Sequence, residues 1–259
     1  MTLGFGEYTE GSSLIHKLDA RIKLVGAFAT IISVVILGHW QMPLVVLFVC
    51  FVLVVYSRAS LKIFLKRLLY PTLVIVLLAV VQPFTYGSTV AATVPWLSWN
   101  IYQEGISFGV LVFTRALSAV AVLNLLILVT PMERVLDSLR WFKIPAAITD
   151  TMMLMFRYIS VLSEESTRIR KAQESRLGYS KDVSVVKKLG NFGTMAGMLL
   201  TKSFDRALTV GDAMVSRGYT GASDLFAGST TKLSRKDSLI GLLIILAVVS
   251  LVIVDIFVL

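Results

Sequence analysis

Five long apolar segments constrain what this chain can fold into. They cover residues 22–39, 44–56, 71–86, 106–130 and 239–259. A helix needs roughly 20 apolar residues to cross a membrane, and most of these segments approach that length. Hydrophobic residues make up 56% of the chain and its mean hydropathy is +0.80, which excludes an ordinary soluble protein. The sequence therefore predicts an all-α membrane protein with about five transmembrane helices.

Cations and aromatic residues predict which ends of these segments face the cytoplasm. Lys17, Arg21 and Lys23 precede the first segment, whereas Trp40 follows it without a cation nearby. Because cytoplasmic loops carry an excess of Lys and Arg, the amino terminus is expected inside. The loop at residues 87–104 contains neither Lys nor Arg and is expected outside. Its expected interfacial anchors are Trp96, Trp99 and Tyr102.

The region between the fourth and fifth apolar segments carries most of the charge. Residues 131–238 hold 17 of the 25 Lys and Arg residues and are expected in the cytoplasm. The predicted organisation is a transmembrane region of four spans at 1–130, a cytoplasmic region at 131–238 and a last span at 239–259. Residues 61–70 alternate cations with apolar residues and predict an interfacial amphipathic helix. Since the cations lie beside apolar spans, the net charge of +9 indicates topology, and no nucleic-acid partner is expected.

Two long helices are predicted to cross within the charged region. Pro145 suits the first turn of a helix, because its φ is fixed and its nitrogen carries no hydrogen. Apolar and small residues then recur at intervals of three and four as far as Arg176, and a second such series ends at Arg217. Gly193 and Gly197 lie in that second series at a spacing that lets two helix backbones approach closely.

One short phrase occurs twice, at the predicted end of each long helix. The two copies read Ala172-Gln173-Glu174-Ser175-Arg176-Leu177-Gly178-Tyr179 and Ala213-Met214-Val215-Ser216-Arg217-Gly218-Tyr219. A cation followed by glycine is a common helix end that needs no partner, because the glycine adopts the left-handed turn. A cap does not require the Ala, Ser and Tyr that both copies share. The repetition therefore favours a function for both arginines.

These paired arginines resemble the coupling motifs, Ala-Arg-Gly or Ala-Arg-Ser, of the transmembrane (T) component of energy-coupling factor (ECF) transporters. The stretch Leu18-Asp19-Ala20-Arg21-x-Lys23-Leu24 is similar to the family's entry to its first span, with Ala20 where proline is usual. The surroundings Arg157-Tyr158-Ile159 and Arg217-Gly218-Tyr219-x-Gly221 resemble the cobalt and nickel branch, the CbiQ family. Leu177 stands after Arg176 where the family has Gly or Ser, so Arg217 is the closer match of the two.

The resemblance implies a non-catalytic subunit of an ATP-driven importer for cobalt or nickel, spanning the prokaryotic cell (inner) membrane several times. Its expected partners are two ATP-binding cassette ATPase subunits, a membrane-embedded metal-binding S component and the lipid bilayer. ATP would bind to the partner subunits, and no cofactor is expected on this chain. Each arginine would enter a groove on one ATPase. The residues implied in this coupling are Ala172, Ser175, Arg176, Ala213, Ser216, Arg217 and Gly218.

Other residues are expected to face the substrate-binding subunit or to hold the spans together. Methionine adapts to surfaces that repack, so a cluster at the start of the first long helix is expected at that interface. The cluster consists of Met152, Met153, Met155 and Phe156. Arg115, inside the fourth span, is expected to contact the same subunit, to pin the spans, or to snorkel towards the membrane surface. Asn124 is expected to hydrogen-bond between spans, and Asp255 to reach the outer interface.

Several functional classes lack their motifs in this sequence. The two histidines, His16 and His39, are predicted on opposite sides of the membrane and cannot share a metal. Neither a phosphate-binding Gly-x-x-x-x-Gly-Lys-Ser/Thr loop nor a nucleophile motif occurs. Three alternatives remain: a T component serving vitamin-binding S components, an intramembrane enzyme, and a channel. The channel would require inverted repeats or broken helices, and the sequence shows neither clearly.

Overall fold

The structure is a computed structural model that describes residues 14–57, 60–87, 89–94, 99–142, 144–180, 182–219 and 235–258. The chain divides into two compact units. We call residues 5–135 with 231–259 the membrane unit, and residues 136–230 with 1–4 the arm unit. Two residues named above, Trp96 and Gly221, lie outside the described part of the chain.

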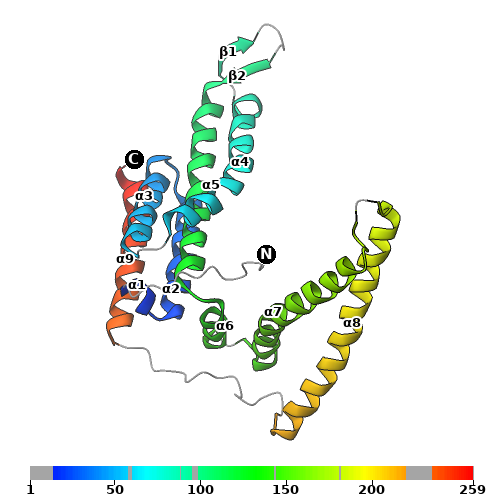
Figure 1. Cartoon of the computed structure of the whole chain (residues 1–259). Coiled ribbons are helices and arrows are strands. Elements are labelled where there is room, and N and C mark those ends of the chain that lie inside the picture. Colours follow the sequence, from blue (N-terminus) through cyan, green and yellow to red (C-terminus); the bar gives the residue numbers. More distant parts are fainter. Residues whose placement is uncertain are drawn as a thin grey trace. The chain divides into compact units, whose positions relative to one another are not determined.

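The membrane unit consists of helices and one short hairpin (Figure 1). Its helices are α1 (Leu14–Lys17), α2 (Ala20–Ile36), α3 (Gln41–Tyr56), α4 (Leu61–Thr85), α5 (Gln103–Val129) and α9 (Arg235–Val258). The hairpin pairs β1 (Val90–Val94) with β2 (Trp99–Tyr102) in antiparallel register within the predicted outer loop. The prediction of an all-α membrane protein is confirmed, with this hairpin as an addition that the sequence analysis missed.

Helix α4 is one continuous helix, although two were predicted in its place. It runs through Pro71 and Pro83, so residues 61–70 are its first turns and not a separate interfacial helix. Proline is tolerated inside membrane helices because neighbouring groups satisfy the backbone carbonyl that it leaves without a donor. Pro71 and Pro83 therefore do not mark helix ends.

Three of the described helices are long and apolar enough to cross a membrane: Leu61–Thr85, Gln103–Val129 and Asp237–Phe257. Helix α3, with 16 residues, is a shorter apolar helix, and α2 has 17 residues. At about 1.5 Å per residue, α2 and α3 each measure about 25 Å, slightly less than a hydrocarbon core of about 30 Å. The prediction of five spans depends on these two short helices and stays a prediction.

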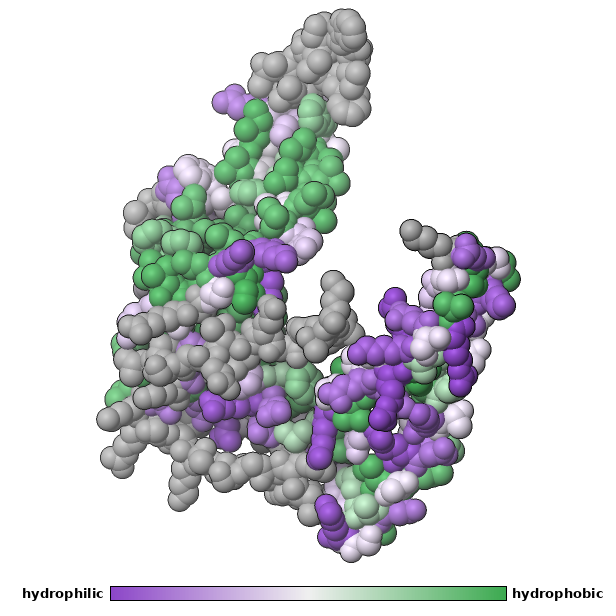
Figure 2. Space-filling view, in the orientation of Figure 1, coloured by the Kyte–Doolittle hydropathy of each residue, from purple (hydrophilic) through white to green (hydrophobic). Residues whose placement is uncertain are grey.

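The core of the membrane unit lies where α2, α3, α4 and α5 meet. Its fully buried side chains include Val34, Val54 and Leu128, with Phe64 beside them. Apolar side chains also cover the outside, and Leu73 of α4 is 74% exposed. Figure 2 shows these apolar surfaces on the membrane unit and mainly hydrophilic surfaces on the long helices of the arm unit. An apolar exterior around a small core is the pattern that a lipid environment requires.

Helix α5 supplies polar side chains that bond to the backbone of neighbouring helices. Asn124 donates through Nδ2 to the carbonyl of Phe64 at 3.0 Å, which confirms the predicted bond between spans. Ser118 donates to the carbonyl of Pro43 at 2.6 Å, and the Arg115 guanidinium donates to the carbonyl of Leu37. Of the three roles expected for Arg115, the structure contains a contact that pins the bundle, and the contact with the substrate-binding subunit stays a prediction.

Asp255 of α9 fixes the end of α2. Its carboxylate accepts hydrogen bonds from the backbone N–H of Gly38 at 2.7 Å and of His39 at 3.3 Å. The His39 ring nitrogen Nδ1 lies 3.1 Å from the same carboxylate. Asp255 is only 7% exposed, and the prediction that it reaches the outer interface stays a prediction. The carboxylate bonds to the backbone that follows α2, and this contact holds α9 to the loop between α2 and α3.

We expect Asp255→Ala to lower the stability of the membrane unit by about 2 kcal/mol, because backbone N–H groups would lose a charged acceptor in a buried position. Asp255→Asn should lower the stability less, because its amide oxygen can still accept hydrogen bonds from these N–H groups. Thermal unfolding of the purified protein in detergent measures the effect. Ser250→Ala is the control, because the Ser250 hydroxyl is exposed and bonds only within α9. Equal melting temperatures for Asp255→Ala and Ser250→Ala would contradict this role.

Candidate functional site

The arm unit is built on two long helices, α7 (Ala146–Ser175, 30 residues) and α8 (Val185–Ser216, 32 residues). The shorter α6 (Met132–Trp141) precedes them. Pro145 directly precedes α7, as its fixed φ predicts. Ser184 caps α8, where its hydroxyl accepts the N–H of Lys187 at 3.4 Å. At about 1.5 Å per residue the two helices measure about 45 and 48 Å.

Both helices end in the same hydrogen-bonded turn, with an arginine as the last residue before it. At the end of α7, Leu177 N–H bonds to Glu174 O and Gly178 N–H to Gln173 O, both at 2.9 Å. At the end of α8 the equivalent bonds are Gly218 N–H to Val215 O at 2.9 Å and Tyr219 N–H to Met214 O at 3.0 Å. This pair of bonds defines the Schellman motif. Arg176 and Arg217 therefore occupy equivalent C-cap positions.

The residue that takes the left-handed conformation differs between the two turns. It is Gly218 after Arg217, with φ +82°, but Leu177 after Arg176, with φ +61°. The prediction that Gly178 makes this turn was wrong. Gly178 is required for another reason: a Cβ there would lie 2.8 Å from Asn191 Nδ2 and 2.9 Å from Gln173 O. Close approach of neighbouring groups, and not φ, excludes a side chain at Gly178.

A cluster of polar contacts closes the elbow between α7 and α8. Gln173 Nε2 donates to Asn191 O at 2.9 Å, and Asn191 Nδ2 donates to Gly178 O at 2.8 Å. The Tyr179 hydroxyl bonds to Gln173 Oε1 at 3.1 Å, and the Arg170 guanidinium lies 5.9 Å from the centre of the Tyr179 ring. These contacts fix the end of α7 against the first turns of α8. Arg176 is thus held at the elbow by contacts that leave its own side chain exposed.

The second arginine turn is held by a different contact. The Tyr219 hydroxyl donates to Asp150 Oδ2 at 3.1 Å, and Asp150, in the second turn of α7, is 1% exposed. The end of α8 therefore returns to the start of α7. In both copies of the repeated phrase, the tyrosine anchors the turn that precedes it. The tyrosine repeated in both copies indicated that this position has a role, but the sequence did not show which residues it bonds.

The predicted coupling residues form two exposed tips. Arg176 and Arg217 are both exposed, as are the alanines and serines of each copy, Ala172, Ser175, Ala213 and Ser216. The serine hydroxyls bond back to their own helices, Ser175 to Ala172 O at 2.9 Å and Ser216 to Asp212 O at 2.5 Å. Because Arg176 lies beside the start of α8 and Arg217 at its end, the tips are separated by roughly the length of that helix, about 48 Å.

The contact between α7 and α8 does not use the glycines predicted for it. A Cβ on Gly193 or Gly197 would meet nothing within 4 Å, so that face of α8 is open within the arm unit. Ile169 of α7 is buried instead, and Lys202 of α8 forms an ion pair with Glu165 of α7. The hydrogen bond from Lys202 is the main cause that lowers the pKa of Glu165. The prediction that Gly193 and Gly197 lie at the crossing was wrong, because the contact is made by other side chains, among them Glu165 and Lys202.

The methionine cluster lies near the start of α7. Met152 is 40% exposed and Met155 is 61% exposed, while Met153 and Phe156 are half-buried. Arg115 belongs to the membrane unit and bonds to Leu37 there. Within the described part of the chain, no three His, Cys, Asp or Glu side chains group in a way that could hold a metal ion.

Comparisons with known proteins give a consistent result. Residues 11–226 match the family CbiQ, described as cobalt transport protein. An uncharacterised protein of Methanocaldococcus jannaschii is 30% identical over 218 residues, which cover 81% of this chain and 78% of that protein. The energy-coupling factor transporter transmembrane protein EcfT 1 of Listeria monocytogenes is 30% identical over 83% of this chain and 84% of its own length. The EcfT protein of Bacillus selenitireducens is 29% identical, with 83% of each chain covered.

The two turns should respond in opposite directions to substitution. Gly218→Ala should destabilise the protein by about 1 kcal/mol, because an L side chain is strained at positive φ. Leu177→Gly should stabilise it by up to about 1 kcal/mol, since the strain it releases, about 1 to 2 kcal/mol, exceeds the backbone entropy it adds. Thermal unfolding followed by circular dichroism reads both changes. Gly211→Ala is the control: it lies inside α8 with open space around it and should stabilise.

The Glu165–Lys202 pair should make the α7–α8 contact sensitive to acid. Since the folded state lowers the pKa of Glu165, the pair stabilises the contact above the ordinary carboxyl value of 4.5. This stabilisation is lost as the pH falls below that value through the lowered pKa. Spin labels on α7 and α8 should report a wider distance distribution once an acid titration has passed the lowered pKa of Glu165 than they do at neutral pH. Glu165→Gln should show the wider distribution under both conditions, and an unchanged distribution in that variant would refute the role of the pair.

Proposed function

Because the chain belongs to the CbiQ family and is the T component of an ECF transporter, we propose that it couples ATP hydrolysis on partner subunits to substrate import. The partners are two ATP-binding cassette ATPases and a membrane-embedded S component that binds the substrate. The chain spans the prokaryotic cell (inner) membrane several times. It binds no cofactor and catalyses no reaction itself, since ATP is bound and hydrolysed by the ATPases.

The observation that carries this proposal is the pair of equivalent, exposed arginine tips. Both Arg176 and Arg217 end a long helix through the same turn, and both side chains are open to a partner. A guanidinium remains charged at all physiological pH values and binds a carboxylate through two parallel hydrogen bonds. Each tip thus fits an acidic groove on one of two ATPases. Two tips about 48 Å apart allow the two ATPases to be engaged at the same time.

The arm unit can transmit displacement because its ends are fixed to each other. The elbow contacts of Gln173 and Asn191 join α7 to α8, and the Tyr219–Asp150 bond joins the end of α8 to the start of α7. When the ATPases close on ATP, a shift of Arg217 therefore moves the start of α7. Met152 and Met155 lie in that part of α7 and are exposed. Their adaptable side chains suit a contact with the S component that repacks during transport.

We propose cobalt or nickel as the substrate, and the family description, cobalt transport protein, supports cobalt. The relatives named EcfT carry no substrate in their names, so an S component that binds a vitamin is the second candidate. The intramembrane enzyme and the channel receive less support. The two polar side chains considered for such a site, Arg115 and Asn124, are both used in backbone hydrogen bonds between helices. Copurification of the assembled transporter, followed by metal analysis, separates cobalt or nickel from a vitamin.

Removing one arginine tip should weaken the ATPase contact far more than removing another arginine of the same helix. We expect Arg217→Ala to reduce ATPase affinity about 30-fold or more, since truncating one member of a desolvated ion pair costs about 2 to 5 kcal/mol. Arg217→Lys should recover part of the affinity, because lysine keeps the charge without the bidentate geometry. Pull-down of the ATPases with the purified chain measures this. Arg206→Ala, at an exposed arginine within α8, is the control, and an equal loss in both variants would refute the proposal.

A further inference from the structure

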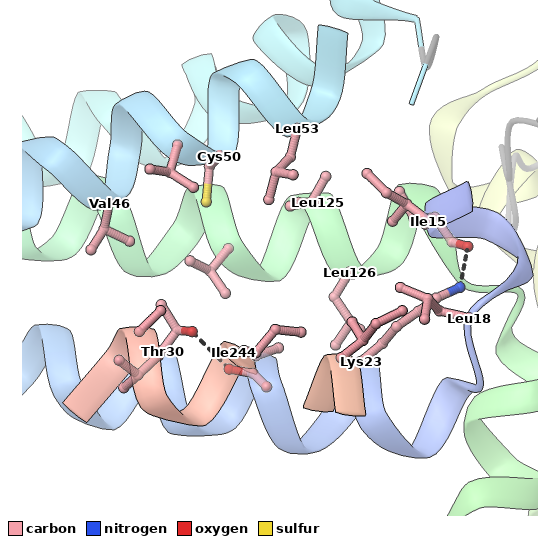
Figure 3. A pocket seen from close by; sticks show the side chains of 18 of the residues that line it. Ile15, Leu18, Lys23, Thr30, Val46, Cys50, Leu53, Leu125, Leu126 and Ile244 are labelled. Atoms are coloured by element: carbon pink, nitrogen blue, oxygen red, sulfur yellow. Dashed lines mark hydrogen bonds between the residues drawn. The ribbon is translucent and has the colours of Figure 1, made fainter. Parts of the chain in front are cut away.

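An apolar groove opens among α1, α2, α3, α5 and α9 of the membrane unit (Figure 3). Its volume is about 470 Å³, which lies within the usual range for ligand sites of about 300 to 1,000 Å³. The lining is almost entirely aliphatic, with Val46 and Cys50 of α3 on one side and Ile244 of α9 on the other. No part of the groove depends on the arm unit.

One end of the groove carries positive charge. Lys23 lines this end, and its ammonium donates to His16 O at 3.3 Å and to Val129 O at 3.4 Å. Among the described residues these two bonds use two of the three N–H donors of the ammonium, so the third can meet an incoming acceptor. Arg134 is close enough to Lys23 to repel its charge. The nearby carboxylate of Asp19, which accepts the N–H of Arg21 at 3.0 Å as the cap of α2, also attracts this ammonium, but less strongly than Arg134 repels it. An anion at this end would reduce the repulsion between the two cations.

The depth of the groove matches one leaflet of a bilayer. Its lining runs from Ile240 to Leu251 along α9, and the eleven steps between these two residues measure about 16 Å. Half of a hydrocarbon core measures about 15 Å. The charged end lies at the start of α2, which the Lys and Arg pattern predicts on the cytoplasmic side. The groove therefore combines the dimensions of an acyl chain with a cation at the depth of the headgroups.

We propose that this groove binds an anionic phospholipid of the cytoplasmic leaflet, with one acyl chain between α2, α3, α5 and α9 and the phosphate at Lys23. Basic pockets between membrane helices on the cytoplasmic side recognise anionic headgroups in this way. Asp255 and Gly38 hold the opposite end of α9 to the backbone that follows α2. A lipid at the charged end would join the same helices by filling the space between them. This site is independent of the arginine tips and of the transported substrate.

Native mass spectrometry of the full chain, delipidated and then exposed to phosphatidylglycerol or phosphatidylcholine, tests the proposal. We expect one phosphatidylglycerol to be retained per chain. Its retention should be at least about fivefold stronger than that of phosphatidylcholine, because only the anionic lipid forms a net ion pair with Lys23 in this partly buried site. Lys23→Gln should abolish the preference for phosphatidylglycerol. Ala247→Phe, which places a ring inside the groove, should abolish retention of both lipids.

Two matched variants separate this site from general lipid contact. Lys66→Gln removes an exposed cation of α4, and Ser250→Phe adds a ring to an exposed position of α9 outside the groove. Both should retain phosphatidylglycerol as the unaltered chain does. Size-exclusion chromatography identifies any variant that fails to fold. Lys23→Gln tests the preference for the anionic headgroup, and Ala247→Phe independently tests whether the lipid occupies the groove. Equal retention of the two lipids by the unaltered chain, or unchanged retention in Ala247→Phe, would overturn the proposal.

Discussion

The hydrogen-bonded turn that ends α7 and α8 is the constraint on which the arm unit depends. A helix leaves its last carbonyls without partners, and the Schellman bonds satisfy them while reversing the chain. In doing so they place Arg176 and Arg217 at the ends of long, exposed helices with their side chains unobstructed. The tyrosine that follows each turn then bonds to a residue of α7, Gln173 or Asp150. In each copy, one short segment thus ends the helix, fixes that end to α7 and exposes an arginine.

In the membrane unit, hydrogen bonds from side chains to the backbone hold neighbouring segments together. Asn124, Ser118 and Arg115 of α5 each bond to a carbonyl of another segment, and Asp255 accepts N–H groups that follow α2. Lipid offers no hydrogen bonds, so such groups must find partners within the protein. Close packing adds to this: a Cβ on Gly26 would lie 3.2 Å from Ile244, and one on Gly241 3.1 Å from Ile22. Small residues therefore let α2 and α9 approach, whereas in α8 they do not serve that purpose.

The sequence predicted the elements that depend on local pattern. Apolar length located the membrane helices, Pro145 located the start of α7, and the repeated phrase located both helix ends. It failed where distant residues decide the outcome. Gly178 is constrained by Asn191 on the next helix, and Asp255 bonds to Gly38, which lies 217 positions earlier. The open face at Gly193 was misassigned because small residues allow close packing without requiring it. The left-handed conformation of Leu177 contradicts its intrinsic preference and follows from the elbow contacts around it.

That leucine makes the two ends of the arm unit energetically unequal. Gly218 adopts its backbone geometry without steric penalty, whereas Leu177 holds a conformation that costs an L-residue about 1 to 2 kcal/mol. The penalty is sustained by the network of Gln173, Asn191 and Tyr179, and it would be released if that network opened. If ATPases bind both ends, as proposed, the end that carries Leu177 would release this strain when its contacts opened, whereas the end that carries Gly218 has none to release.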